Sequence, residues 1–391
     1  MTSRTAKRWS LILLFLSGTS VCWTDNTEFF LGGYIKNIDL YALYNDGRML
    51  DEPRLKKPEP DTRLIGSDLN RLRLESELNF GSYWHSEIWL DTELQQGIIS
   101  SSQDIADAEQ RGQTNAWSNL TWTLSKGHGY HLQQLFPRAL VTLETGQWTA
   151  TLGRQRITWG TGFVWNPTDL LNPTDPLAVE RAEKGGINAF YVARAIGDLS
   201  QIEVVLAEDD QRRSGPMYLS AATRVSGNLF NYDFSVLYGR FGKNHTFGGD
   251  FAGYLGNAGF RGELAYTLTG GALSASDTVR AILNADYNFP YDIYTLVEFH
   301  LLAQPHQRLS TTSTQLQMAA MVSKSITPLF AANLFVLFNA DDRSMVVGPT
   351  FTFVPNDNIE FMLGSYLFAG DEESLYGPMP QIGFTSTAYH F

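Results

Sequence analysis

The sequence predicts an all-β protein: a transmembrane antiparallel β-barrel formed by a single domain over residues 23–391. Three observations lead to this prediction. Apolar and polar residues alternate along many segments of about ten residues, as in barrel strands that face lipid on one side and water on the other. Aromatic residues make up 13% of the chain, and yet no segment after the N-terminus has the ~18 consecutive apolar residues of a membrane-spanning helix. Both ends of the chain also carry features of an exported barrel.

Residues 1–22 have the features of a secretory signal peptide. Arg4, Lys7 and Arg8 form a basic beginning, the apolar run Leu11–Leu16 follows, and small residues near Cys22 offer a cleavage site. The alternative is an N-terminal anchor helix, for which the apolar run is short.

The cysteine count and the charge exclude several classes of protein. Cys22 is the only cysteine, so cleavage after it leaves a chain without disulfides, thiol nucleophiles or cysteine-based metal sites. We expect neither a metal nor a cofactor. The formal charge of −12 becomes −15 when the three cations of the signal peptide are removed. An acidic surface repels phosphates, so nucleic-acid binding is not expected.

The segment Arg71–Phe80 illustrates the strand pattern. Its apolar residues share one face of a strand: Leu72, Leu74, Leu78 and Phe80. Its polar residues share the other face: Arg71, Arg73, Glu75, Glu77 and Asn79. Charges at every second position suit a water-filled lumen better than a packed core. A secreted, soluble all-β protein is the alternative, since a half-exposed sheet shows the same alternation.

We count eighteen such strands, with sixteen as the alternative. An even number brings both termini to the periplasmic side. A barrel of this size encloses an aqueous channel unless something fills it. The long outer loops are expected at about residues 43–67, 95–133 and 160–186. At the other end of the chain, Phe391 with Tyr389 resembles the C-terminal signal by which outer-membrane proteins engage the barrel-assembly machinery.

The segment Gly153–Pro176, GRQRITWGTGFVWNPTDLLNPTDP, differs from its surroundings. Continued alternation from the preceding strand would point Arg154 and Arg156 into lipid, which costs about 2–4 kcal/mol per residue at the membrane centre. A β-bulge at Gly153 would shift the alternation by one residue. We therefore expect Arg154 and Arg156 to face the lumen, and Ile157 and Trp159 to face lipid.

Beyond Trp159 the chain is expected to leave the regular strand and to fold into the barrel. Prolines remove ladder donors, and two Asn-Pro-Thr-Asp repeats predict consecutive turns. A short helix is predicted over residues 175–184, with Asp175 as its N-cap and with Glu180 and Glu183 exposed. The glycine spacing matches neither a Walker A loop nor a dinucleotide fingerprint, so no phosphate site is predicted.

The same segment carries a family resemblance. The residues that carry it are Gly153-Arg154-Gln155, Trp159-Gly160, Asn166-Pro167-Thr168-Asp169-Leu170 and Asn172-Pro173. Together they resemble the signature of porin-like outer-membrane barrels akin to the alginate-export and related porin families. The motif covers about 24 residues, and the barrel likeness covers the mature chain. The resemblance implies the fold and a bacterial outer-membrane location; the substrates of the group are diverse.

We expect a passive channel for small polar or charged solutes, narrowed by loop 160–186. The basic candidates for the constriction are Arg71, Arg73, Arg138, Arg154 and Arg156. The acidic candidates are Asp169, Asp175, Glu180 and Glu183. Opposed rows of charge would orient solutes across the constriction. The alternative role for these residues is to fasten the loop to the wall as salt bridges.

Two other functions are weighed against the channel. An outer-membrane lipase or protease needs a histidine near a nucleophile and an orienting group, and no local motif supplies them. An outer component of an export or multi-protein complex would use the long loop 95–133 for docking. Assembly into a homo-oligomer is compatible with each of these functions.

Overall fold

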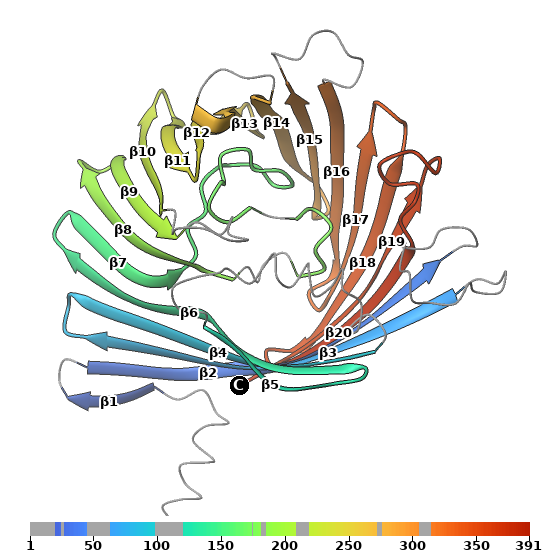
Figure 1. Cartoon of the computed structure of the whole chain (residues 1–391), viewed down its shortest axis with the longest axis horizontal. Helices are drawn as coiled ribbons and strands as arrows, with labels where there is room; N and C mark the ends of the chain where they lie inside the picture. The colour runs from blue at the N-terminus through green and yellow to red at the C-terminus, as the bar shows by residue number, and fades with distance from the viewer. Residues whose placement is uncertain are drawn as a thin grey trace, which may run out of the picture.

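The computed structural model describes residues 20–24, 27–44, 63–97, 120–173, 175–180, 185–208, 219–271, 276–304 and 314–391. Their strands form one antiparallel sheet that closes on itself (Figure 1). The twenty strands are β1 Ser20–Thr24, β2 Thr27–Tyr44, β3 Arg63–Phe80, β4 Trp84–Gly97, β5 Thr121–Gly127, β6 Tyr130–Thr145, β7 Trp148–Gln155, β8 Ile187–Ile196, β9 Ser200–Glu208, β10 Leu219–Leu229, β11 Tyr232–Phe241, β12 Asn244–Leu255, β13 Ala258–Leu268, β14 Thr278–Phe289, β15 Ile293–Ala303, β16 Thr314–Thr327, β17 Phe330–Asn339, β18 Met345–Asn356, β19 Ile359–Ala369 and β20 Gln381–His390.

Eighteen of these strands make the barrel, which confirms the predicted number. Each pairs with the next in the chain, β4 pairs with β6, and β20 returns to pair with β2 from Tyr34↔His390 to Leu43↔Gln381. The last two backbone bonds of this seam join Gly33 and Phe391, at 3.0 and 3.1 Å. The two remaining strands, β1 and β5, pair only along parts of β2 and β6. β1 begins at Ser20, inside the predicted signal peptide, whose cleavage stays a prediction.

Strand β5 lies within residues 95–133, which were predicted to form an outer loop. β7 ends at Gln155 and pairs with β6 only as far as Ala139↔Arg154. Beyond that point β5 pairs with β6 along the edge that β7 leaves open, from Thr121↔Leu135 to Gly127↔Tyr130. β5 therefore takes the place of β7 beside β6, and the barrel wall continues where β7 ends.

The two faces of the barrel have the predicted polarity. Apolar side chains are exposed on the outside, for example Leu72 at 39%, Leu152 at 64% and Leu264 at 53%. Charged side chains are buried on the inside, where Arg73 is 4% and Asp91 is 1% exposed. An apolar outer belt around a polar interior is the pattern that a lipid bilayer imposes on a closed barrel.

One end of the barrel carries a series of short turns, which include the two-residue connection Phe230–Asn231, where both residues have positive φ angles of 54° and 63°. This is the backbone that matches the twist of paired strands. In the described part of the chain, no helix is long and apolar enough to cross a membrane. The only helical element described there is the 3-10 turn η2 Thr269–Gly271.

Candidate pore constriction

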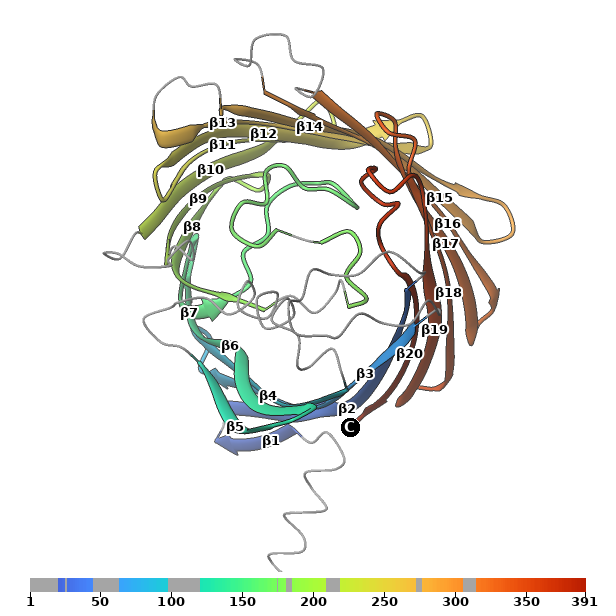
Figure 2. The ribbon, with the colours of Figure 1, turned by 45° about the vertical axis from the view of Figure 1, so that its right-hand side comes forward.

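The chain leaves the wall after Gln155 and returns to it at Ile187, and the described part of the connection, residues 156–173, 175–180 and 185–186, lies inside the barrel (Figures 1 and 2). We call residues 156–186 the inner loop. Ile157 and Trp159 are only 5% and 3% exposed and pack against Val205 and Leu237 on the inner face of β8–β11. The prediction that Ile157 and Trp159 face lipid is therefore wrong, because the chain has already turned inward before it reaches them.

The predicted β-bulge at Gly153 is also wrong. Pairing runs without a register shift on both sides of this residue, at Leu140↔Gly153 and Gly153↔Ala189. Gly153 has a φ angle of +125°, and a Cβ there would lie 2.2 Å from the carbonyl oxygen of Ala139. Glycine is thus required for a close approach to β6 while the strand stays in register.

The two arginines of the motif lie in different surroundings. Arg154 is 8% exposed and donates hydrogen bonds to the carbonyl oxygen of Phe136 at 3.2 Å and to Oδ1 of Asn188 at 3.3 Å. It therefore links β6 and β8 at the end of β7. Arg156 is exposed. Its neighbour Ile157 packs on the inner wall, and the lumenal position of Arg156 stays a prediction.

Glu263 on β13 holds the first part of the inner loop. Its Oε1 accepts hydrogen bonds from the backbone N–H groups of Thr161 and Gly162, at 2.5 and 2.6 Å. Its Oε2 accepts from the backbone N–H and the hydroxyl of Thr168, at 3.0 and 2.8 Å. A Cβ at Gly160 would lie 2.6 Å from Oε1, so the glycine of the motif leaves room for this carboxylate.

Glu298 on β15 holds the next residues in the same way. Its carboxylate accepts hydrogen bonds from the backbone N–H groups of Phe163 at 2.8 Å, Val164 at 3.2 Å and Trp165 at 2.8 Å. Asn284 donates a further bond at 3.0 Å. Glu298 is 0% exposed, and an ionised carboxylate at such a site needs several donors.

Apolar contacts continue the attachment beyond these carboxylates. Val164 is buried in a cluster with Leu296, Phe335 and other inner-face residues of β15–β20, and Trp165, Leu177 and Val179 pack against it. The indole of Trp165 stacks on the ring of His300, with centroids 5.0 Å apart. The inner loop thus contacts the β8–β11 wall at one end and the β15–β20 wall further along.

Glu180 fastens the inner loop to a third part of the wall. It forms an ion pair with Lys36 Nζ at 2.7 Å and accepts a hydrogen bond from Arg71 at 2.8 Å, and Arg71 Nε also contacts Glu93 at 2.6 Å. The structure therefore brings the predicted residues Arg71 and Glu180 together.

The other two predicted wall cations are paired on the wall itself. Arg73 bonds to both oxygens of Asp91, at 2.6 and 2.7 Å, and Arg138 bonds to Glu87 at 2.9 Å. Both guanidinium groups also lie over the indole of Trp89, Arg138 at 3.9 Å and Arg73 at 5.0 Å from its centroid.

The first Asn-Pro-Thr-Asp repeat, residues 166–169, forms a turn, as predicted. Asp169 is 2% exposed and accepts from the backbone N–H of Asn172 at 3.2 Å, while its own N–H donates to the carbonyl oxygen of Asn166 at 3.1 Å. Asn172 accepts from the N–H of Ile157 and donates to the carbonyl oxygen of Gly185, at 3.3 and 2.8 Å. Pro167 lies within this turn, whereas the turn predicted for the second repeat, residues 172–175, falls partly outside the described residues and stays a prediction.

The short helix predicted from Asp175 is not formed in the described residues 175–180. Asp175 does accept from the N–H of Leu177 at 2.8 Å, as an N-cap would, but residues 175–180 make a turn followed by irregular backbone. Packing of Leu177 and Val179 against the apolar wall, together with the pairing of Glu180, replaces the helical bonds. The predicted position Glu183 lies outside the described residues.

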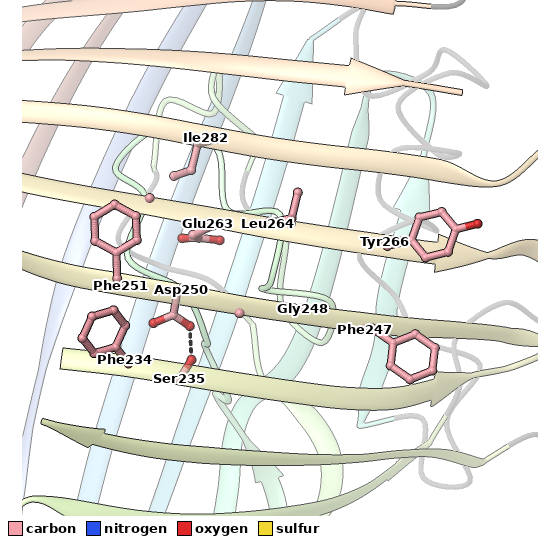
Figure 3. A pocket seen from close by; sticks show the side chains of 12 residues that line it. Phe234, Ser235, Phe247, Gly248, Asp250, Phe251, Glu263, Leu264, Tyr266 and Ile282 are labelled. Atoms are coloured by element: carbon pink, nitrogen blue, oxygen red, sulfur yellow. Dashed lines mark hydrogen bonds between the residues drawn. The ribbon is translucent and has the colours of Figure 1, made fainter. Parts of the chain in front are cut away.

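A cavity of about 530 Å³ lies in the wall beside Glu263 (Figure 3). Phe234 and Phe251 stand at one end of it and Phe247 and Tyr266 at the other, with Gly248 between them. The backbone there is covered by few side chains, because β12 and β13 carry several glycines.

Sequence reasoning missed Glu263 and Glu298, although they hold the inner loop. Both occupy inner-face positions of ordinary alternating strands. Their partners are backbone N–H groups 95 to 135 residues away. Every residue except proline has a backbone N–H group, so the sequence does not show which of these groups bind a carboxylate. Glu263 and Glu298 are identified only by their burial in the structure.

Comparison with known proteins supports the fold. No family model and no curated protein matches the chain. Among solved structures it is similar to Pseudomonas aeruginosa OccK9 (10% identity over 92% of this chain and 98% of that one, TM-score 0.56) and to Acinetobacter baumannii OccAB3 (9% identity, 92% and 99%, TM-score 0.54). It is also similar to Pseudomonas aeruginosa OccK11, with 9% identity over 92% and 96% and a TM-score of 0.51. At these identities the likeness shows the fold alone. A closed barrel with an apolar outer belt belongs in the bacterial outer membrane.

Proposed function

We propose that the protein is a porin-like channel for the passive transport of small polar or charged solutes, and not an enzyme. The observation that carries the proposal is the inner loop, which narrows a closed barrel of eighteen strands while its lumen keeps a charged wall. A barrel of this size is wide enough to conduct when its interior is polar. Among the described histidines, His85, His131 and His245 hydrogen-bond to Asn79, Thr123 and Tyr238, an arrangement that supplies no serine nucleophile.

Several finer expectations belong to this proposal. Lipids would cover the apolar outer face, and the barrel-assembly machinery would engage the C-terminal Phe391. Assembly into a homo-oligomer is compatible with the barrel. The motif in the inner loop would be shared with porins of the alginate-export type, and its residues Gly153, Gly160 and Asn172 would hold the loop in place, as their contacts suggest.

The test is single-channel recording of the refolded full-length chain in planar lipid bilayers. We expect stepwise currents that scale with salt concentration; a refolded barrel that inserts and gives no current would overturn the proposal. Two variants separate the roles of the motif arginines. Arg156→Gln should change the conductance or the ion preference, since Arg156 is exposed and is predicted to face the lumen. Arg154→Gln should mainly lower the stability, because Arg154 links β6 and β8.

A further inference from the structure

The inner face of the barrel carries more carboxylates than cations. Alternation and contacts place eight lysines and arginines of the described strands there: Lys36, Arg71, Arg73, Lys126, Arg138, Arg224, Arg261 and Arg280. The same criteria place fourteen carboxylates there: Glu28, Glu75, Glu77, Glu87, Asp91, Glu93, Glu144, Glu203, Asp233, Asp250, Glu263, Asp286, Glu298 and Glu360. The described part of the inner loop adds Arg156 against Asp169, Asp175 and Glu180. The balance of the lumen is therefore negative.

Most of the wall cations are already neutralised by neighbours. Besides the pairs of Lys36, Arg71, Arg73 and Arg138 described above, Arg224 contacts Glu203 at 3.2 Å and Asp250 at 3.5 Å. Arg261 is paired with Asp286. Asp250 in turn accepts from the hydroxyl of Ser235 (Figure 3). A cation that shares its charge between two carboxylates attracts anions from the lumen only weakly.

The surplus negative charge lies on two groups of carboxylates. Those of the first group bind uncharged donors, and those of the second lie near the end of the barrel that carries the short turns. Among the contacts of the described residues, Glu263 and Glu298 bond to backbone and hydroxyl or amide groups and to no cation. Glu77 faces another carboxylate, Glu87, directly across the strand pair. Glu360 follows the tight turn before β19 on the inner face.

We propose that the channel prefers cations, and that the solutes it passes best are small organic cations such as amines. This inference rests on the proposed channel function. Walls of low dielectric concentrate the field of fixed charges in an aqueous lumen, so an excess of carboxylates raises the local concentration of cations. Rings of Asp and Glu select cations in this way in other pores.

The preference is measured as the reversal potential of the refolded full-length protein in a tenfold KCl gradient. We expect a permeability ratio of K⁺ to Cl⁻ of about threefold or more at low salt, since fixed charge sets the local ion concentrations. The ratio should fall toward one near 1 M salt, where the Debye length shrinks to about 3 Å. A ratio of one or below at low salt would overturn the preference while leaving the channel function intact. Absence of any current would contradict the channel function itself.

A matched pair of variants tests whether the lumen is the source. Glu77→Gln with Glu360→Gln removes two inner charges and should lower the ratio at least twofold. Asp39→Asn with Asp68→Asn removes two charges from outer-face positions, as shown by the exposed neighbours Ile35 and Leu72 on the same alternation. This control should leave the ratio unchanged. Loss of preference in the outer variant alone would contradict a lumenal origin.

Solutes of equal length and opposite charge test the proposed class directly. Butane-1,4-diamine should block or carry current at lower concentration than butanedioate, by about the same factor as the K⁺ preference. Stronger interaction with butanedioate would overturn the proposed solute class. Heat-dependent gel mobility of each variant shows whether the barrel has folded, so a failed fold is not mistaken for lost selectivity.

Discussion

Two side chains, Glu263 and Glu298, determine where the inner loop sits. Each is a buried carboxylate surrounded by N–H donors that belong to the loop backbone. Hydrogen bonds to an ionised acceptor are stronger than neutral ones. Five of these donors, Thr161 to Trp165, are consecutive in the chain, so they depend on the loop conformation and are lost together if the loop moves. The side chains of the loop add packing, and the carboxylates fix its position.

Replacement of Glu298 by glutamine should loosen the loop. The amide keeps the size of the side chain, but its NH₂ group would face N–H donors and leave at least one of them unsatisfied. A buried unsatisfied donor costs about 1–3 kcal/mol. We therefore expect urea unfolding in detergent to show a loss of stability of this size, and single-channel currents to become noisier.

Glu360→Gln is the control for this effect, since Glu360 has no contact with the inner loop in the described structure. It should leave both the stability and the noise close to those of the parent protein. Equal losses in the two variants would mean that removal of any inner carboxylate destabilises the barrel. In that case Glu298 would have no special part in holding the loop.

At the scale of elements, one loop pair outside the membrane-spanning strands is joined in a similar way. Asp342, between β17 and β18, accepts from the backbone N–H and hydroxyl of Ser344 at 2.8 and 2.6 Å, and from the N–H of Leu375 at 2.6 Å. Leu375 belongs to the segment between β19 and β20. Partial burial alone would raise the pKa of Asp342, but these hydrogen bonds outweigh it and hold the pKa below its usual range.

This arrangement predicts a defined pH dependence. A carboxyl whose pKa is lower in the folded state stabilises that state above its unfolded pKa, and the effect is lost as the pH falls through the folded pKa. The stability difference between the parent and Asp342→Asn should therefore be constant from pH 7 to 5. It should shrink only below about pH 4, where the free carboxyl begins to protonate. Thermal unfolding across this range measures it; a difference that vanished already at pH 6 would contradict the assignment.

The sequence predicted the strands better than the inner loop, for a physical reason. Apolar and polar residues alternate along the strands because lipid and water lie on opposite faces. Each strand therefore shows the pattern within its own sequence, as in Arg71–Phe80. The inner loop has no such period. Its path depends on Glu263 and Glu298 far along the chain, so the bulge at Gly153 and the helix from Asp175 were inferred from local rules that long-range contacts override. β5 was missed because its pairing partner is decided by where β7 ends.

At the scale of the whole molecule, Phe391 extends the seam that closes the barrel. Backbone bonds between Phe391 and Gly33 complete the β20–β2 seam. Deletion of Phe391 should remove both bonds and lower the stability of the refolded barrel, whereas Phe391→Ala should keep them. If the aromatic ring is the assembly signal, Phe391→Ala should refold normally in detergent but reach the outer membrane of cells poorly. Equal refolding defects in both variants would contradict this separation of roles.

The position of the inner loop between β7 and β8 has a consequence for the order of folding. The loop is synthesised about 100 residues before Glu263 and about 135 before Glu298, as the separations of the bonded pairs show. It can take its final conformation only after β13 and β15 are in place. Contacts between such distant segments form slowly, because the chain must first close a long intervening stretch. Docking of the loop is therefore a late event, and an assembly intermediate that contains β2–β11 should have a more open interior than the finished protein.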